Sequence, residues 1–117
     1  MAFTTKSSDS LLSQGQVVQN DPTRSDFVAP HAGGVPVGLV IDASEVYGGD
    51  LDNPTVTGYS ARIIYGGGDH PVQVETPTGY DGRISRFDVQ ANGVITPVEV
   101  GGVGSLVGLN PTWATWG

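Results

Sequence analysis

Turn-forming residues interrupt this sequence so often that long helices are disfavoured along it. The 117 residues include 18 glycines and 8 prolines, more than a fifth of the chain. Glycine and proline are the strongest local breakers of regular structure, whereas short strands joined by tight turns tolerate them. A chain of this length forms one domain at most. We therefore expect an all-β fold with a single small core.

Alternating apolar residues predict strands in the region after residue 30. The first strand is indicated by four apolar residues that share one face: Val35, Val37, Leu39 and Ile41. Further strands are predicted over residues 54–66, 72–76, 83–91, 94–100 and 103–109. Six short strands at such spacing indicate a small antiparallel β-barrel or sandwich.

The dipeptide Asn92-Gly93 is the strongest hairpin signal in the chain. Both residues of a type I′ turn need positive φ angles, which Asn and Gly tolerate best. A two-residue turn here sets a register in which Arg86 lies opposite Glu99, an opposite-charge pair. Because Pro97 has no N–H to donate, the strand 94–100 is expected at an edge of its sheet.

Residues 1–30 show neither a strand period nor a helix period. Ordering thirty backbone units costs about 1–2 kcal/mol each, and burying an apolar side chain returns about 1.5–3 kcal/mol. Only seven apolar side chains are available: Phe3, Leu11, Leu12, Val17, Val18, Phe27 and Val28. We therefore predict an extended N-terminal arm over residues 1–30 that stays loose or folds onto its own body or a partner. Residues 31–117 then form the β domain, with a short aromatic tail at its end.

The charge and the absence of cysteine exclude several classes of function. Five Lys and Arg against twelve Asp and Glu give a net charge of −7, which disfavours nucleic acid and anionic membranes. Without cysteine, disulfides and Cys-zinc sites are impossible. The first residues have no apolar segment typical of a signal peptide, and no apolar run reaches the roughly 20 residues of a membrane helix. A soluble, non-secreted protein is expected.

The glycine-rich segment 65–82 resembles a ligand loop only superficially. It matches neither the phosphate-binding nor the dinucleotide-binding glycine spacing, so we interpret it as a turn between strands. Asp69 and His70 could act as an acid–base pair or, together with His31, as metal ligands. We expect both histidines to be solvated loop residues instead.

Four carboxylates lie close together in the sequence: Asp42, Glu45, Asp50 and Asp52. Their spacing does not follow the EF-hand order for calcium, so a solvated acidic loop is the expected structure and calcium the alternative. No nucleophile motif of the hydrolase type is present. We expect no enzyme activity, no cofactor and no metal.

Two tryptophans, Trp113 and Trp116, lie within the last five residues. They are interpreted either as a cap on the open end of the barrel or as exposed anchors for a partner, because Trp is enriched at interface hot spots. A third interpretation joins them with Tyr80 in a platform that stacks on carbohydrate.

The layout of the chain resembles that of capsid decoration (cement) proteins of tailed bacteriophages. The resemblance lies in the Ser/Thr/Gln-rich arm that leads into "VAPHAGGVPVGLVIDAS", and in the short β body with "VGLVID" and "GGVGSLVGL". It implies a homotrimer made in the host cytoplasm and located on the outer face of the virion, where it bridges neighbouring subunits of the major capsid protein.

The residues expected to contact the partner are apolar residues of the arm and the tail: Phe3, Leu11, Leu12, Val17, Val18, Phe27, Trp113 and Trp116. The arm would add a strand to an exposed sheet edge. The alternatives are another virion module, such as a tail-tube, fibre or baseplate protein, and a carbohydrate-binding β domain.

Overall fold

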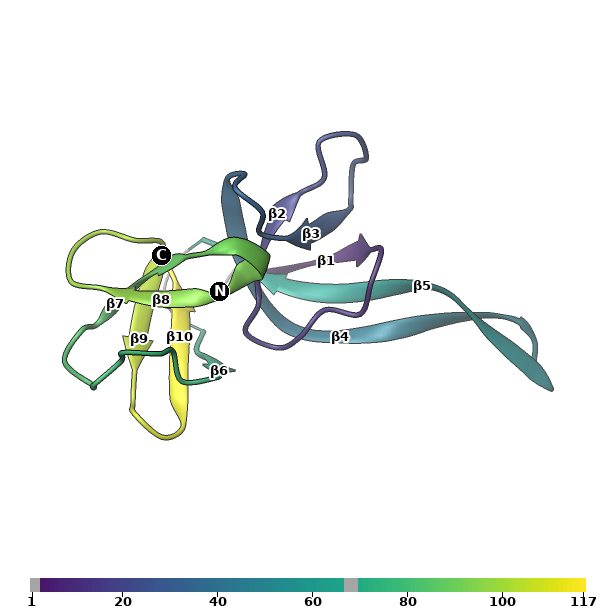
Figure 1. Cartoon of the computed structure of the whole chain (residues 1–117). Coiled ribbons are helices and arrows are strands. Elements are labelled where there is room, and N and C mark those ends of the chain that lie inside the picture. Colours follow the sequence, from purple (N-terminus) through teal and green to yellow (C-terminus); the bar gives the residue numbers. More distant parts are fainter. Residues whose placement is uncertain (1–2, 67–69) are drawn as a thin grey trace.

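The protein is all-β, as expected, and consists of two antiparallel five-stranded sheets (Figure 1). The structure is a computed structural model and describes residues 3–66 and 70–117. The two sheets pack as a β-sandwich, and the chain completes the first sheet before it enters the second. The glycine-rich segment that was interpreted as a turn joins the two sheets, although its residues 67–69 lie outside the described part.

The first sheet contains the N-terminal half of the chain. Its strands, in spatial order, are β1 (Phe3–Ser8), β5 (Asn53–Ile64), β4 (Pro36–Asp50), β2 (Val17–Asn20) and β3 (Val28–Pro30). The two outer strands, β1 and β3, approach each other. Ser7 of β1 forms a parallel bridge with Phe27, just before β3, and the Ser7 N–H donates to the Asp26 carbonyl at 2.8 Å. The sheet is therefore strongly curled.

The second sheet is built from the remaining strands. In spatial order these are β6 (Val72–Val74), β10 (Thr112–Trp116), β9 (Gly104–Val107), β7 (Arg86–Val89) and β8 (Ile95–Val98). β8 is an edge strand and contains Pro97, which confirms the expectation from the missing N–H.

Pairs of adjacent apolar residues bury both faces of the first sheet. One residue of each pair faces the core between the two sheets and packs there with residues of the second sheet. These residues of the first sheet are Val17, Leu39 and Ile64. Their neighbours Val18, Val40 and Ile63 face a second core on the other side, which the curled strands and Leu12 enclose. Strands that are buried on both faces lack the simple alternation of a half-buried strand.

The N-terminal segment folds onto the body of the chain, one of the outcomes expected for it, but the predicted boundary between an arm over residues 1–30 and a β domain over 31–117 is wrong. Residues 3–8 pair with β5, and residues 17–20 pair with β4. Leu12, Val17 and Val18 are buried, with exposed fractions of 5%, 0% and 0%. The comparison of ordering cost with burial treated residues 1–30 in isolation. In the structure, β4 and β5 supply the hydrogen-bonding edges and the apolar surface that order this segment.

The prediction of an aromatic tail is also wrong, since residues 112–116 form β10 between β6 and β9. Trp113 and Trp116 are half-buried and lie on opposite faces of this strand, because side chains alternate along a strand and these two are three positions apart. Trp116 packs against the inter-sheet core, and its ring centre lies 6.5 Å from that of Phe87.

The β7–β8 hairpin forms with a register one residue away from the predicted one. Asn92 and Gly93 have positive φ angles of 62° and 76°, as expected. The turn contains three residues, Ala91–Gly93, and the Gln90 N–H donates to the Val94 carbonyl at 2.7 Å. The longer turn places Arg86 opposite Val98 and not opposite Glu99.

Arg86 bonds to the C-terminal region of the chain. Its guanidinium donates to the Gly101 carbonyl at 2.9 Å and to the Gly117 carbonyl and the Ser105 hydroxyl at 3.0 Å each. These bonds attach the 99–103 loop and the end of β10 to β7.

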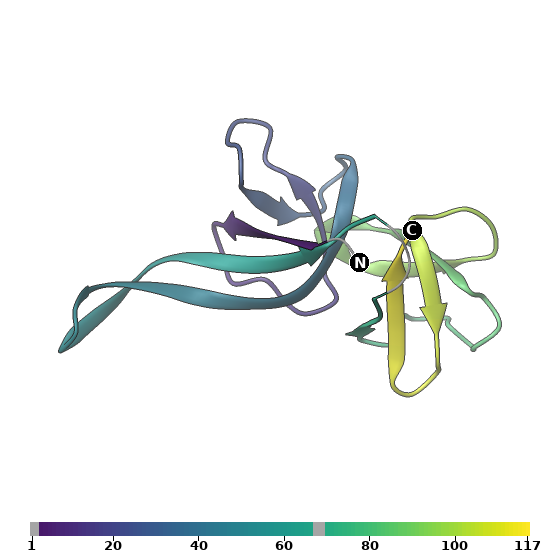
Figure 2. The same cartoon turned by 180° about the vertical axis from the view of Figure 1, so that it is seen from behind.

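A long hairpin formed by β4 and β5 projects from the body of the molecule (Figures 1 and 2). The longest dimension of the chain is 52 Å, against 30 and 25 Å for the other two. The radius of gyration is 15.0 Å, larger than the roughly 13 Å expected for a compact chain of this length. The four carboxylates expected in a solvated loop are exposed, but they belong to this hairpin: Asp42, Glu45 and Asp50 lie on β4, and Asp52 lies in its turn.

Candidate functional site

Among the described residues, no strand lies beside the outer part of the β4–β5 hairpin on either side. β1 pairs with β5 only as far as the Ser8–Tyr59 pair, and β2 pairs with β4 only as far as the Val17–Leu39 pair. We call residues 45–58 the ribbon. A two-stranded hairpin of this kind is marginally stable in water unless a third strand or another surface supports it.

Local features of the sequence explain why the ribbon forms. Leu51 and Asp52 make a two-residue turn between Asp50 and Asn53. Gly49 has a φ of +85° next to this turn, a conformation that favours glycine. Closer to the body, the register shifts between Val46 and Tyr47, which indicates a bulge on β5.

Four large apolar residues of the ribbon are exposed to solvent: Val46, Tyr47, Leu51 and Val56. Leu51 is completely exposed at the apex, and Tyr47 is 59% exposed. The Tyr47 hydroxyl donates a hydrogen bond to the Glu45 carboxylate, which raises the pKa of the tyrosine. Tyr47 and Val56 lie opposite each other, so the ribbon exposes an apolar pair that can contact another protein.

A hollow of about 540 Å³ lies where the ribbon joins the body. Its lining comes from three segments: residues 7–9, residues 24 and 27, and ribbon residues with Tyr59. The Arg24 guanidinium carbon lies 4.0 Å from the ring centre of Phe27, in cation–π contact. Phe27, one of the expected partner contacts, is half-buried beside the ribbon.

Arg24 is held in place by two carboxylates. Its guanidinium donates to Asp9 at 2.5 Å and to Asp21 at 2.7 Å. The hydrogen bonds from Arg24 hold the pKa of both carboxyl groups below their ordinary range, and those from Thr23 lower that of Asp21 further. The loop that borders the hollow is therefore fixed by a charged network.

The five cations of the chain are all engaged away from the ribbon carboxylates. Four of them pair with aspartates: Lys6 with Asp26, Arg24 with Asp9 and Asp21, Arg62 with Asp42, and Arg83 with Asp81. Arg86 bonds to carbonyl and hydroxyl oxygens. Within the described residues, no Lys or Arg pairs with Glu45, Asp50 or Asp52, so the ribbon carries uncompensated negative charge.

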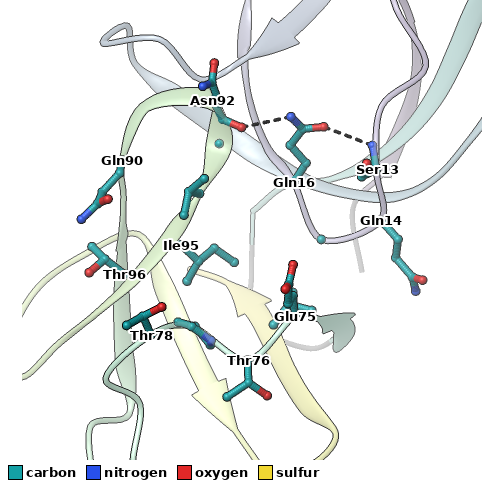
Figure 3. A pocket seen from close by; sticks show the side chains of 15 residues that line it. Ser13, Gln14, Gln16, Glu75, Thr76, Thr78, Gln90, Asn92, Ile95 and Thr96 are labelled. Carbon is teal, nitrogen blue, oxygen red and sulfur yellow. Dashed lines mark hydrogen bonds between the residues drawn. The ribbon is translucent and has the colours of Figure 1, made fainter.

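A second hollow, of about 660 Å³, lies between the 13–16, 74–78 and 90–96 segments (Figure 3). Gln16 spans its upper rim, where its amide donates to the Asn92 carbonyl at 3.0 Å and accepts from the Ser13 N–H at 3.1 Å (Figure 3). The lining is about equally polar and apolar: eight of its fifteen residues carry hydroxyl or amide side chains, and Glu75 is the one charged residue among them. One carboxylate without a partner acid, base or nucleophile gives no recognisable catalytic arrangement.

The expectation that His31 is solvated is wrong. The residue is 8% exposed, and its ring nitrogens lie 2.9 Å from the Gly34 carbonyl and 3.3 Å from the Gln90 carbonyl. His31 thus joins the two sheets. His70 is half-buried, and Asp69 lies outside the described residues. Across residues 3–66 and 70–117, no three His, Asp or Glu side chains converge in a way that could hold a metal ion.

The remaining predicted partner contacts divide into exposed and buried residues. Phe3 and Leu11 are 46% and 51% exposed and are accessible to a partner. Leu12, Val17 and Val18 are core residues, which contradicts their assignment to a partner surface. The predicted strand over residues 54–66 covers the β5 half of the ribbon, but the β4 half was interpreted as an acidic loop, although the Gly48-Gly49 pair before Asp50 is a signal of a turn.

No helix among the described residues has the length and apolar character needed to cross a membrane. Comparisons with protein-family models, with curated proteins and with solved structures found no match to this chain.

Proposed function

We propose that the protein is a structural component of a virion that binds the outer surface of an assembled phage capsid and bridges neighbouring capsid subunits. The observation that supports this proposal is the ribbon: no strand in the described part of the chain pairs with either of its edges, and the side chains of Leu51, Tyr47 and Val56 are exposed. An element that its own body leaves unsupported is stabilised when another surface completes it. In this proposal the major capsid protein provides that surface.

The physical effect of such binding is stabilisation of the shell by linkage. A protein that binds the assembled shell and not its dissociated subunits raises the stability of the assembly. If the copies form the homotrimer that the resemblance implies, three ribbons act together, and the second and third contacts become effectively intramolecular. Modest affinity per ribbon then suffices for high occupancy.

The ribbon also suits the alternative of another virion module, such as a tail-tube or baseplate protein, in which it would contact the next copy or ring. The carbohydrate alternative has weaker support. Trp113 and Trp116 lie on opposite faces of β10, and Tyr80 belongs to the inter-sheet core, so these three rings do not share a stacking surface.

The proposal is tested by shortening the hairpin. A variant in which an Asn-Gly turn joins Ser44 to Ser60, its partner in the ladder, removes the ribbon together with Tyr59, keeps the register of β4 and β5, and leaves both cores intact. We expect this variant to fold and to lose binding to shells of the cognate major capsid protein in co-sedimentation. Normal occupancy of the shells by the folded variant would contradict the proposal, and measurement of the solution mass tests the trimer separately.

A further inference from the structure

We propose that the outer edge of β4 within the ribbon accepts an extended, cationic segment of another protein as an additional antiparallel or parallel β-strand. This inference rests on the proposed function in one respect, namely that the ribbon is the docking element. It adds the mode of contact, which is strand addition, and the chemistry of the partner segment, which is an alternation of Lys or Arg with β-branched residues.

The other outer strands of the two sheets are short or protected. β8 contains Pro97, β6 has three residues, and β1 and β3 are bridged to each other through Ser7 and Phe27. Proline, short length and coverage by a neighbouring strand are the means by which natural sheets prevent unwanted edge pairing.

The β5 side of the ribbon is protected as well. Pro54 lies opposite Gly49, next to the hydrogen-bonded turn pair Asp50–Asn53, so its nitrogen faces the outer edge and offers no donor. The register shift opposite Val46 leaves Thr57 as an extra residue, and a bulge of this kind also disfavours pairing.

The β4 side of the ribbon lacks such protection. From the turn pair Asp50–Asn53, the alternation of an antiparallel ladder directs the backbone N–H and C=O groups of Tyr47 away from β5. Beyond the bulge, the same alternation directs those of Glu45 and Ala43 outward. These three outward-facing residues lie in a part of β4, residues 43–50, that contains no proline or lysine, and they provide donors and acceptors for another strand.

The charge of the ribbon selects the kind of strand that can pair there. Glu45 lies on the free strand, and Asp50 and Asp52 follow at the turn, all without a Lys or Arg partner in the described part of the chain. Opposite charges across a strand pair stabilise it, and like charges destabilise it. Pairing with the β4 edge of a second copy would bring two such sets of carboxylates together, so a cationic segment of a different protein is favoured.

The test uses isotope-labelled full-length protein and short synthetic peptides followed by NMR. The first peptide alternates Lys with Val and Thr, and the second carries Glu in place of Lys. The third keeps the Lys sequence but is methylated on two successive central backbone nitrogens, which blocks both edges of the strand without changing its charge. We expect the first peptide to shift the amide signals of Glu45 and Tyr47 and to slow their hydrogen exchange, and the other two to lose this effect.

Variants of the protein test the role of charge. Glu45→Gln and Asp50→Asn should each weaken binding of the Lys peptide by about two- to fivefold, the effect of one cross-strand charge pair. Asp88→Asn, which changes a carboxylate of the second sheet, is the matched control and should leave the affinity unchanged. Equal effects of all three variants would show attraction by net charge alone and would contradict strand pairing.

The outcomes separate this inference from the proposed function. Failure of the Lys peptide to bind, equal binding of the methylated peptide, or amide shifts confined to Ile95 and Thr96 in the other hollow would overturn the inference. Binding of the peptide to the β4 edge together with no binding to shells would uphold the inference and contradict the capsid proposal. Binding to shells that requires the ribbon, with no strand pairing by any peptide, would uphold the capsid proposal and contradict the inference.

Discussion

Tyr47 lies directly opposite Val56 in the ribbon, and both side chains are exposed to solvent. This aromatic–β-branched pair lies beyond the reach of both cores. Cross-strand pairs of this type stabilise a hairpin by about 0.2–1 kcal/mol relative to alanine. The pair therefore supports the ribbon locally and contributes little to the stability of the body.

The first prediction follows from this separation. Tyr47→Ala should increase amide exchange in the ribbon while leaving the Tm of the whole protein nearly unchanged. Leu39→Ala, in the inter-sheet core, should lower the free energy of unfolding by about 2–5 kcal/mol. A large loss of global stability in Tyr47→Ala, measured by chemical denaturation, would show that the ribbon is part of the cooperative core.

The second prediction concerns the N-terminal segment. Deletion of residues 1–28 removes β1 and β2 and, with them, the buried residues Leu12, Val17 and Val18. We expect this truncated chain to show no cooperative unfolding transition, because both cores lose buried residues and one edge of β4 loses its paired strand. A sharp thermal transition and dispersed NMR signals for the truncated protein would contradict the integrated sheet.

The third prediction compares two glycines that both have positive φ angles. A Cβ atom on Gly93 would lie 2.4 Å from the Val17 carbonyl oxygen, whereas one on Gly79 would meet no atom within 4 Å. Gly79→Ala should cost about 1–2 kcal/mol of stability from backbone strain alone. Gly93→Ala should cost more, because β2 and the turn must also separate. Equal midpoints of urea unfolding for the two variants would rule out this close approach.

The fourth prediction concerns the pH dependence of the Arg24 network. Asp9 and Asp21 have folded-state pKa values below the ordinary value of about 3.9. Their stabilisation is therefore fully present above that value and is lost as the pH falls through the lower folded-state pKa values. In Arg24→Gln, the pKa of Asp9 should return to its ordinary range. That of Asp21 should return only in part, since Thr23 still donates to it.

Carboxyl NMR titration checks this result. Asp81 provides an internal control, because it pairs with Arg83 and should titrate in the same way in both proteins. An unchanged titration of Asp9 in Arg24→Gln would show that the ion pair does not form in solution.

The sequence was sufficient to predict the fold class, the hairpin at Asn92-Gly93 and the edge position of the strand with Pro97. These depend on local properties, namely turn chemistry, alternation and a missing donor. The exact register of that hairpin was not accessible, because Asn-Gly also suits a two-residue turn. In the structure the turn has three residues, and Gly93 lies against Val17, which is distant in the sequence.

The N-terminal strands were missed for a related reason. Val17-Val18 looked unpatterned because the two residues enter different cores on the two faces of the sheet. The same doublet pattern at Leu39-Val40 and Ile63-Ile64 could have indicated a strand buried on both faces. The β4 half of the ribbon was missed because its carboxylates and glycines are also typical of a solvated loop.

Leu51 provides the most direct test of the account, because it is completely exposed at the apex of the ribbon and contributes to neither core. Val100, 88% exposed in the second sheet's 99–103 loop, is the matched control. In co-sedimentation with shells of the cognate capsid protein, Leu51→Ser should lose occupancy by tenfold or more, a loss that corresponds to about 1.4 kcal/mol, while Val100→Ser binds as the unmodified protein does. Equal occupancy of the shells by both variants would contradict docking through the ribbon.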